Sequence, residues 1–247
     1  MAKKGHENRA MLKSKLVSYL RRFWHFIWED NSIWSWIANI ILAFLIIRFL
    51  VYPGLGFMLG TTHPIVAVVS NSMEHDSQGF SAWFDQRSYF YQQYGISKEG
   101  FKGFDMMNGF NKGDIIFLMG KKPDELDIGD IIVFKAMKFD ASAGKLYPVD
   151  IIHRVIRKWK QDDKYYFQTK GDRNPYSIES YINRTTGEFL NPIYKNSTDA
   201  LALLDETLVN EDNIVGKASF RVPWLGWVKL AFSETVSFLS TGLRTLF

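Results

Sequence analysis

Cysteine is absent from this chain of 247 residues, which excludes disulfide bonds, thiolate metal ligands and a cysteine nucleophile. Histidine is scarce: the chain has five, and no pair of them has the helical spacing typical of a zinc site. Phosphate-binding loops and dinucleotide fingerprints are also missing. We therefore expect no metal and no cofactor, and only Ser, Thr or Lys can supply a nucleophile.

The net charge is a modest +4, and the basic residues cluster near the N-terminus rather than across the chain. This distribution argues against a nucleic-acid partner. Residues 1–32 combine that basic charge with apolar residues at roughly helical spacing. They predict an amphipathic helix on the cytoplasmic leaflet of a membrane, or alternatively a helix packed on a partner subunit.

A long apolar run follows at residues 33–59, with Trp34 and Trp36 at one end and Tyr52 near the other. Its length and its aromatic rims predict a transmembrane helix and not a cleaved signal peptide, because no small-residue cleavage pattern follows. Basic residues crowd the side before the run. The positive-inside rule then places the N-terminus in the cytoplasm and everything after residue 60 outside.

The stretch from Ile65 to Met73 reads as a strand of β-branched residues that ends in a small polar turn with Ser70 and Ser72. A strand that delivers a serine to a fixed point is a usual way to present a hydroxyl nucleophile. The alternative is a hairpin end with two turn-forming serines.

Residues 113–171 favour β-structure throughout, with Gly-Asp turns at short spacing. We predict a mainly β fold: an antiparallel barrel or sandwich, preceded by the amphipathic and transmembrane helices. The expected strands are residues 113–118, 129–134, 149–159, 165–170 and, closing the domain, 213–222.

The expected β domain covers residues 60–227 and contains an insertion at 76–112. The insertion is rich in aromatic residues and predicts one short helix near 81–94. Its aromatics either contact a membrane or partner, or form an apolar cluster of their own. The last segment, 228–247, predicts an amphipathic helix or a second span. Asn183 and Asn196 match glycosylation acceptor motifs, which are short and often occur by chance.

His153 is the only histidine inside an expected strand, and it is either a structural residue or the base that a serine requires. A histidine base needs an orienting acid. Asp172 lies in the loop after the strand that should pair with the His153 strand, so it either approaches the imidazole or forms a local turn.

Four sequence blocks, in this order and behind a span of this orientation, resemble those of type I signal peptidases of the archaeal and endoplasmic-reticulum kind (peptidase family S26). The match covers residues 35–60 and most of 64–227. The blocks are Ser70-Asn71-Ser72-Met73, Lys112-Gly113-Asp114-Ile115, residues 129–134 leading to 152–156, and Thr169-Lys170-Gly171-Asp172-Arg173-Asn174-Pro175. In addition, residues 216–218 and 222–226 resemble the family's closing segment.

The resemblance implies that Ser72 is the nucleophile and His153 the general base. It also implies that the Ser70 hydroxyl and the Ser72 amide stabilise the oxyanion. Asp172 matches one acid of the family. The family's second acid, six residues later, is replaced here by Ile178. We expect Asp172 to orient the histidine, with the neighbouring Glu179 in reserve.

A membrane-bound serine endopeptidase that removes signal peptides from exported preproteins is the implied function. An extended substrate would add as a strand beside Ile65, Val66 and Val68, with Met73 also in contact. The expected partners are preprotein signal peptides, the lipid bilayer, and the translocation machinery or accessory subunits. The expected location is the cell membrane, or one resembling the endoplasmic reticulum, with a single span.

Two other functions remain open from the sequence. A membrane-anchored β-domain could bind exported chains or partner subunits without cleaving them, which the missing acid at Ile178 would explain. A self-cleaving repressor or related protease shares the serine-centred β fold. The membrane span and a histidine at position 153 in place of lysine argue against that second alternative.

Overall fold

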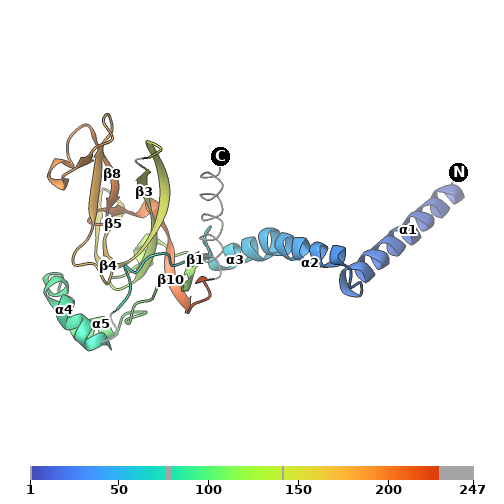
Figure 1. Cartoon of the computed structure of the whole chain (residues 1–247), viewed down its shortest axis with the longest axis horizontal. Helices are drawn as coiled ribbons and strands as arrows, with labels where there is room; N and C mark the ends of the chain where they lie inside the picture. The colour runs from blue at the N-terminus through green and yellow to red at the C-terminus, as the bar shows by residue number, and fades with distance from the viewer. Residues whose placement is uncertain (1, 76–78, 141, 228–247) are drawn as a thin grey trace, which may run out of the picture. The chain divides into compact units, whose positions relative to one another are not determined.

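The computed structural model describes residues 2–75, 79–140 and 142–227 (Figure 1). Contacts divide the chain into two compact units, Met1–Leu55 and Gly56–Phe247. The division falls inside the apolar helix rather than at residue 60, where we expected the β domain to begin. The expected amphipathic or membrane-spanning tail at 228–247 lies outside the described residues.

The first unit contains α1 (Ala2–Trp28) and the first part of the apolar helix, α2 (Ile33–Ile46). Ser32 caps α2, because its side chain accepts the N–H of Ser35. The Ser35 hydroxyl donates in turn to the Phe26 carbonyl at 2.6 Å, and the Asn39 amide donates to the Ile27 carbonyl at 2.9 Å. The polar residues near the start of α2 therefore fix the turn between the two helices.

The apolar helix continues from α2 through a π turn, Ile47–Val51, into α3 (Tyr52–Leu59). Pro53 lies just after the π turn, and it cannot donate the main-chain hydrogen bond that a regular helix needs there. The wider turn accommodates this local loss. Among the described residues, this helix, Ile33–Leu59, is the one long and apolar enough to cross a membrane.

The second unit is built on a seven-stranded antiparallel sheet, with strands in the order β1-β2-β10-β3-β4-β5-β9. This arrangement confirms the mainly β, antiparallel fold. The strands are β1 (Ile65–Ala67), β2 (Ile115–Met119), β3 (Ile131–Asp140), β4 (Lys145–Gln161), β5 (Lys164–Lys170), β9 (Val209–Asn210) and β10 (Ile214–Val222).

Strand β1 is an end strand of this sheet and pairs with β2. It is shorter than the expected strand, since regular pairing stops at Ala67. The Val68 N–H still donates to the Asp114 carbonyl at 2.9 Å, and the Gly113 N–H donates back to the Val68 carbonyl. These bonds hold the chain against the start of β2 until it turns toward Ser72.

Strand β10, the last in sequence, lies between β2 and β3 and pairs with both. Its ladder with β2 is irregular between Ala218 and Phe220, and its ladder with β3 shifts between Ile214 and Gly216. One core cluster lies beneath this region. It consists of Val68, Met73, Phe110, Ile116, Leu118, Ile131, Val133 and Ala218.

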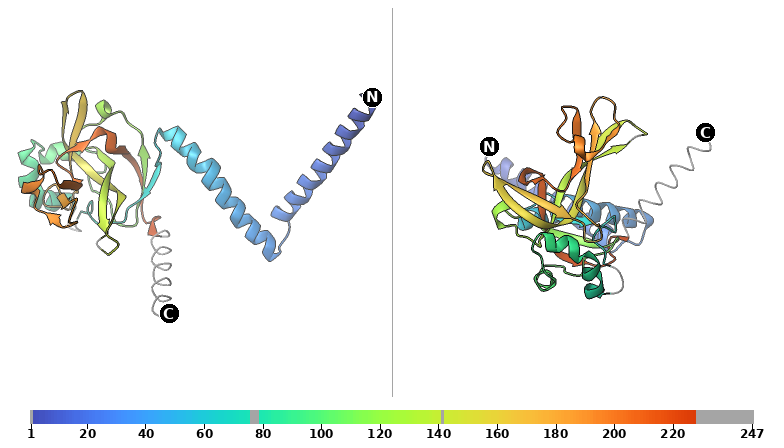
Figure 2. Two further views of the ribbon diagram at one scale, coloured as in Figure 1. Left: turned by 90° about the horizontal axis from the view of Figure 1, so that it is seen from above. Right: turned by 90° about the vertical axis from the view of Figure 1, so that its left-hand side faces the viewer.

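A second sheet, of three antiparallel strands in the order β7-β6-β8, was not predicted from the sequence. Its strands are β6 (Glu179–Asn183), β7 (Phe189–Leu190) and β8 (Ala200–Asp205). Short 3₁₀ turns occupy Pro123–Glu125, Pro192–Tyr194 and Glu211–Asn213. The second sheet and the end of the β3–β4 hairpin lie on one side of the unit, opposite the insertion helices (Figure 2).

The insertion forms two helices, α4 (Gly79–Gln93) and α5 (Lys98–Lys102), close to the expected helix at 81–94. All but one of its aromatic rings are buried or partly buried, so the alternative of an apolar cluster is the correct one for them. The cluster consists of Trp83, Phe84, Tyr91, Ile96 and Phe101, with Ile156 from β4. Tyr89 is the exception, at 80% exposed.

Candidate active site

Ser72 lies in the turn that follows β1, and its hydroxyl is 3.2 Å from the hydroxyl of Ser70. Its main chain is anchored, because the Ser72 carbonyl accepts the N–H of Arg173 at 2.8 Å. Met73, the next residue, is 1% exposed and packs in the core. A buried residue directly after the serine fixes where the serine hydroxyl points.

His153 lies on β4, opposite Ile132 of β3, and is almost completely buried. Its Nε2 atom is 2.9 Å from the Ser72 hydroxyl oxygen. Two residues that are 81 positions apart in sequence are thus in hydrogen-bonding distance. This is the geometry a serine and a histidine need for proton transfer between them.

Gly171 lies against both of these residues. A Cβ atom at this position would be 2.8 Å from the Ser72 carbonyl oxygen and 2.8 Å from Nε2 of His153. Both distances are too short for any side chain. The glycine of the Gly171-Asp172 loop is therefore required by close approach to the serine and the histidine.

The second imidazole nitrogen, Nδ1 of His153, contacts the carboxylate of Glu206. Glu206 follows directly after β8 and is fully buried. We did not predict this residue from the sequence. Its only sequence signal is the run of alternating small and large apolar residues at 200–204, which indicates a strand that ends just before the acid.

Asp172, our expected orienting acid, does not contact His153. Both of its oxygens accept from the Arg154 guanidinium, at 2.9 and 2.8 Å, and Nε2 of His75 is 3.0 Å from one of them. Burial alone would raise the pKa of Asp172, but Arg154 and His75 outweigh it and hold that pKa well below its usual range. Successive residues of a strand point to opposite faces, so Arg154 points away from the face of β4 that carries His153. Asp172, paired with Arg154, therefore lies on the other face from the imidazole.

Glu179, the reserve acid, also lies away from the histidine. One of its carboxylate oxygens accepts from Lys195 at 3.2 Å and from the Thr207 hydroxyl at 3.0 Å. It belongs to the first position of β6 and is partly exposed. The contact between Ser72 and His153 is the one that the family resemblance implied, whereas neither acid that we expected beside the histidine contacts it.

Lys170 is a buried cation beside this site. Its ammonium donates to three main-chain carbonyls, those of Gly171, Asp172 and Asn174, and it lies over the ring of Tyr91 at 4.8 Å. Burial lowers the pKa of Lys170 to about 8, and the negative charge of Asp172 opposes this shift. The lysine thus orders the loop that holds Gly171.

The four residues expected to bind substrate separate into two groups. Ile65 and Val66 lie on β1, the end strand, and both are partly exposed. Val68 and Met73 are 2% and 1% exposed and belong to the core. Their side chains pack in the core, so only their main chain could meet a substrate, and the substrate contacts of all four residues stay a prediction.

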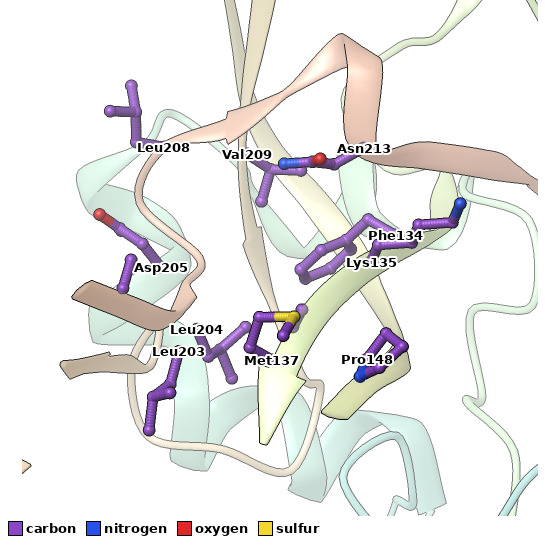
Figure 3. A pocket seen from close by; sticks show the side chains of 12 residues that line it. Phe134, Lys135, Met137, Pro148, Leu203, Leu204, Asp205, Leu208, Val209 and Asn213 are labelled. Carbon is purple, nitrogen blue, oxygen red and sulfur yellow. The ribbon is translucent and has the colours of Figure 1, made fainter. Parts of the chain in front are cut away.

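A pocket of about 370 Å³ lies elsewhere in the second unit, between β3 and the segment that contains β8 and β9 (Figure 3). Phe134 and Met137 line it from β3, and Leu204 and Val209 from the other side. Neither Ser72 nor His153 lines this pocket. The candidate chemistry is therefore not located in it.

The sequence matches no protein-family model. Among curated proteins, the signal peptidase complex catalytic subunit sec11 of Aspergillus terreus is 25% identical over 186 residues, which are 75% of this chain and 74% of the relative. This chain is related to signal peptidase catalytic subunits. SEC11 subunits of Scheffersomyces stipitis and Komagataella phaffii are also 25% identical, over 193 and 194 residues, and the matches cover 77% and 75% of this chain and 78% and 76% of those subunits.

These relatives support the resemblance to signal peptidases that four sequence blocks indicated. All three come from fungi, so they give no support to its archaeal part. Their shared name describes the catalytic subunit of a complex, not a peptidase that acts alone.

Proposed function

We propose that this protein is a membrane-bound serine endopeptidase that removes N-terminal signal peptides from exported preproteins, as a signal peptidase I. The observation that carries the proposal is the 2.9 Å contact between the Ser72 hydroxyl and Nε2 of His153. The names of the relatives supply the substrate class. The alternative of a binding domain without catalytic activity has no comparable support, because the serine and the base are in contact.

The proposed reaction is acyl transfer through Ser72. His153 removes the hydroxyl proton at Nε2 while the oxygen attacks the carbonyl carbon of the scissile peptide bond. The carbon–nitrogen bond then breaks as His153 gives the proton to the leaving amine, which leaves an acyl ester on Ser72. Water, deprotonated by His153, hydrolyses the ester, and Ser72 regains its proton.

The oxyanion that forms during the attack needs donors that are already in place. In the proposal, the Ser72 amide and the Ser70 hydroxyl serve as these donors. The Ser70 hydroxyl is 3.2 Å from the attacking oxygen, which supports this role. Removal of a single oxyanion donor typically lowers kcat by about 10²–10³-fold.

The proposed substrate is an extended peptide that adds as a strand beside β1. The position of β1 at the end of the sheet supports this binding mode, since an end strand can pair with an added strand. Shallow apolar subsites near Ile65 and Val66 would select small residues at the first and third positions before the cut.

In the proposed topology the helix Ile33–Leu59 crosses the membrane once, the N-terminus is cytoplasmic, and the second unit acts on the outer or luminal side. The apolar helix and the basic segment before it support this orientation. The membrane would be the endoplasmic reticulum or a cell membrane that serves export. Accessory subunits and the translocation machinery are the proposed partners, because the relatives are named as subunits of a complex.

The test uses the full chain in membranes with a preprotein substrate. We expect Ser72→Ala and His153→Ala, made separately, each to abolish processing, while Ser88→Ala, at a partly exposed position of α4, leaves it unchanged. Processing by either active-site variant at the wild-type rate would refute the peptidase function. Binding of preproteins without cleavage by the wild-type protein would favour the non-catalytic alternative.

A further inference from the structure

Glu206 is held in place by main-chain hydrogen bonds to two separate segments, at Ile178 and at Thr169. Its carboxylate accepts the N–H of Ile178 at 2.6 Å, and its own N–H donates to the Ile178 carbonyl at 2.9 Å. The Thr169 N–H donates to the Glu206 carbonyl at 2.8 Å, and the Thr169 hydroxyl lies 3.2 Å from the carboxylate oxygen that contacts His153. A glutamate with this many fixed contacts has one available orientation.

We propose that Glu206 is the positioning residue for His153: it accepts the Nδ1 proton and thereby keeps Nε2 free to take the Ser72 proton. The proposal rests on the proposed peptidase function. The Glu206 carboxylate lies beside Ile178, the position at which the resembling family has its second acid. In this chain the orienting carboxylate comes from a different segment, 28 residues further along.

The donors around Glu206 require a carboxylate rather than an amide. The Ile178 N–H occupies one carboxylate oxygen, and the other faces Nδ1 of His153 and the Thr169 hydroxyl. Glutamine at position 206 would direct its single oxygen to the Ile178 N–H. Its NH₂ group would then face Nδ1, which would have to accept, and the proton would move to Nε2. A histidine protonated at Nε2 cannot serve as the base for Ser72.

Two other carboxylates near the site are engaged with other partners in the described part of the chain. Asp172 is paired with Arg154 and His75. Asp205 accepts from the Tyr181 hydroxyl and from Thr207. Glu206 is thus the acid whose geometry matches the role. The three-stranded sheet becomes part of the active site, because the pairing of β6 with β8 places Ile178 beside Glu206.

The decisive experiment compares Glu206→Gln, Glu206→Asp and Glu211→Gln in the full-length protein in membranes. Glu211 is a matched control, because its carboxylate also accepts a main-chain N–H, that of Tyr165, and makes no contact with His153. We expect Glu206→Gln to lower kcat by about 10⁴-fold with little change in KM, as loss of the orienting acid does in other serine proteases. Glu211→Gln should keep the wild-type kcat.

The order of the two Glu206 variants separates positioning from packing. Gln preserves the size of Glu but not its charge, whereas Asp preserves the carboxylate on a shorter side chain. Positioning predicts that Asp retains more kcat than Gln. A purely structural role predicts the reverse, and that order, or a wild-type kcat in Glu206→Gln, would overturn the proposal.

A measurement on the wild-type protein applies even if these variants do not fold. In ¹⁵N-histidine-labelled enzyme at neutral pH, we expect His153 to carry its proton on Nδ1, with the signal assigned by its loss in His153→Gln. A neutral imidazole protonated on Nε2 would overturn the inference. Loss of processing in Ser72→Ala together with normal kcat in Glu206→Gln would refute the role of Glu206 alone, whereas activity of Ser72→Ala would refute the peptidase function itself.

Discussion

Arg154 and Asp172 form an ion pair in which both side chains are completely buried, with 2.8 Å between Nη2 and Oδ2. The pair lies next to the serine–histidine contact without joining it. Arg154 also donates to the main-chain carbonyls of Asp105, Met106 and Gly129. One guanidinium therefore connects the insertion, the start of β3 and the Asp172 loop.

Asp172→Asn should destabilise the folded protein rather than selectively slow the reaction. Removing one partner of a buried ion pair leaves an unpaired charge and typically costs about 3–5 kcal/mol. We expect thermal unfolding of the second unit at a clearly lower temperature. Asp85→Asn, which removes a mostly exposed partner of Lys98, is the control and should cost less than about 1 kcal/mol. Equal effects of the two changes would contradict this account.

Gly171→Ala should remove activity from a protein that still folds. The added Cβ would press on the Ser72 carbonyl and on Nε2 of His153, and a displacement of about 1 Å at reacting groups can cost about 10²-fold in rate. Preprotein cleavage measures the effect, with thermal unfolding as the check on folding. Gly103→Ala, where the nearest contact of a Cβ would be an ordinary 3.4 Å, should retain activity. A fully active Gly171→Ala would disprove the tight approach.

Lys170 should make stability depend on pH in the alkaline range. Its pKa is about 8 when folded and about 10.4 in an unfolded chain, so the unfolded state binds more protons between these values. Stability from this group therefore rises as pH increases from 8 to 10.4, by at most about 3 kcal/mol. Unfolding temperatures of wild type and Lys170→Met across this range provide the measurement. The same pH slope in both proteins would exclude Lys170 as its source.

Phe101→Ala should destabilise the second unit by about 3–5 kcal/mol, because the ring is fully buried in the aromatic cluster of the insertion. Its face also contacts the Arg154 guanidinium, 4.7 Å from the ring centre. Chemical unfolding is the appropriate measurement, and Tyr89→Ala, at an exposed ring on α4, should have little effect. If the insertion were a separate element outside the core, Phe101→Ala would also be nearly neutral.

The residue pattern was sufficient to predict the strand before Ser72 and the pairing of β4 with β5, whereas the approach of His153 to the serine was implied by the family resemblance. The strand and the pairing depend on local patterns, which are β-branched runs and a two-residue hairpin turn at Asp162-Asp163. Both turn residues adopt the left-handed conformation that a tight hairpin requires.

The acid could not be predicted in the same way. Glu206 is 53 residues from His153 in sequence. It directly follows β8, a short strand of the small sheet whose residues show no strong alternation of polar and apolar side chains. Its position depends on a cross-strand register, β6 with β8, that is set by tertiary packing. Asp172 was a reasonable expectation, but the neighbouring Arg154 is a stronger partner for a buried carboxylate than a histidine on the opposite face of the strand.

The place of β10 in the sheet also bears on the order in which the main sheet is assembled. The segments that contain Ser72 and His153 precede β10 in the chain, yet in the described structure β2 and β3 are joined through β10, the last strand. Such a non-local pairing forms late in folding, because a long loop must close first. We therefore expect β1 and β2, which precede and follow Ser72, to join β3 and β4, the strand of His153, in one sheet only after β10 has paired with both sides.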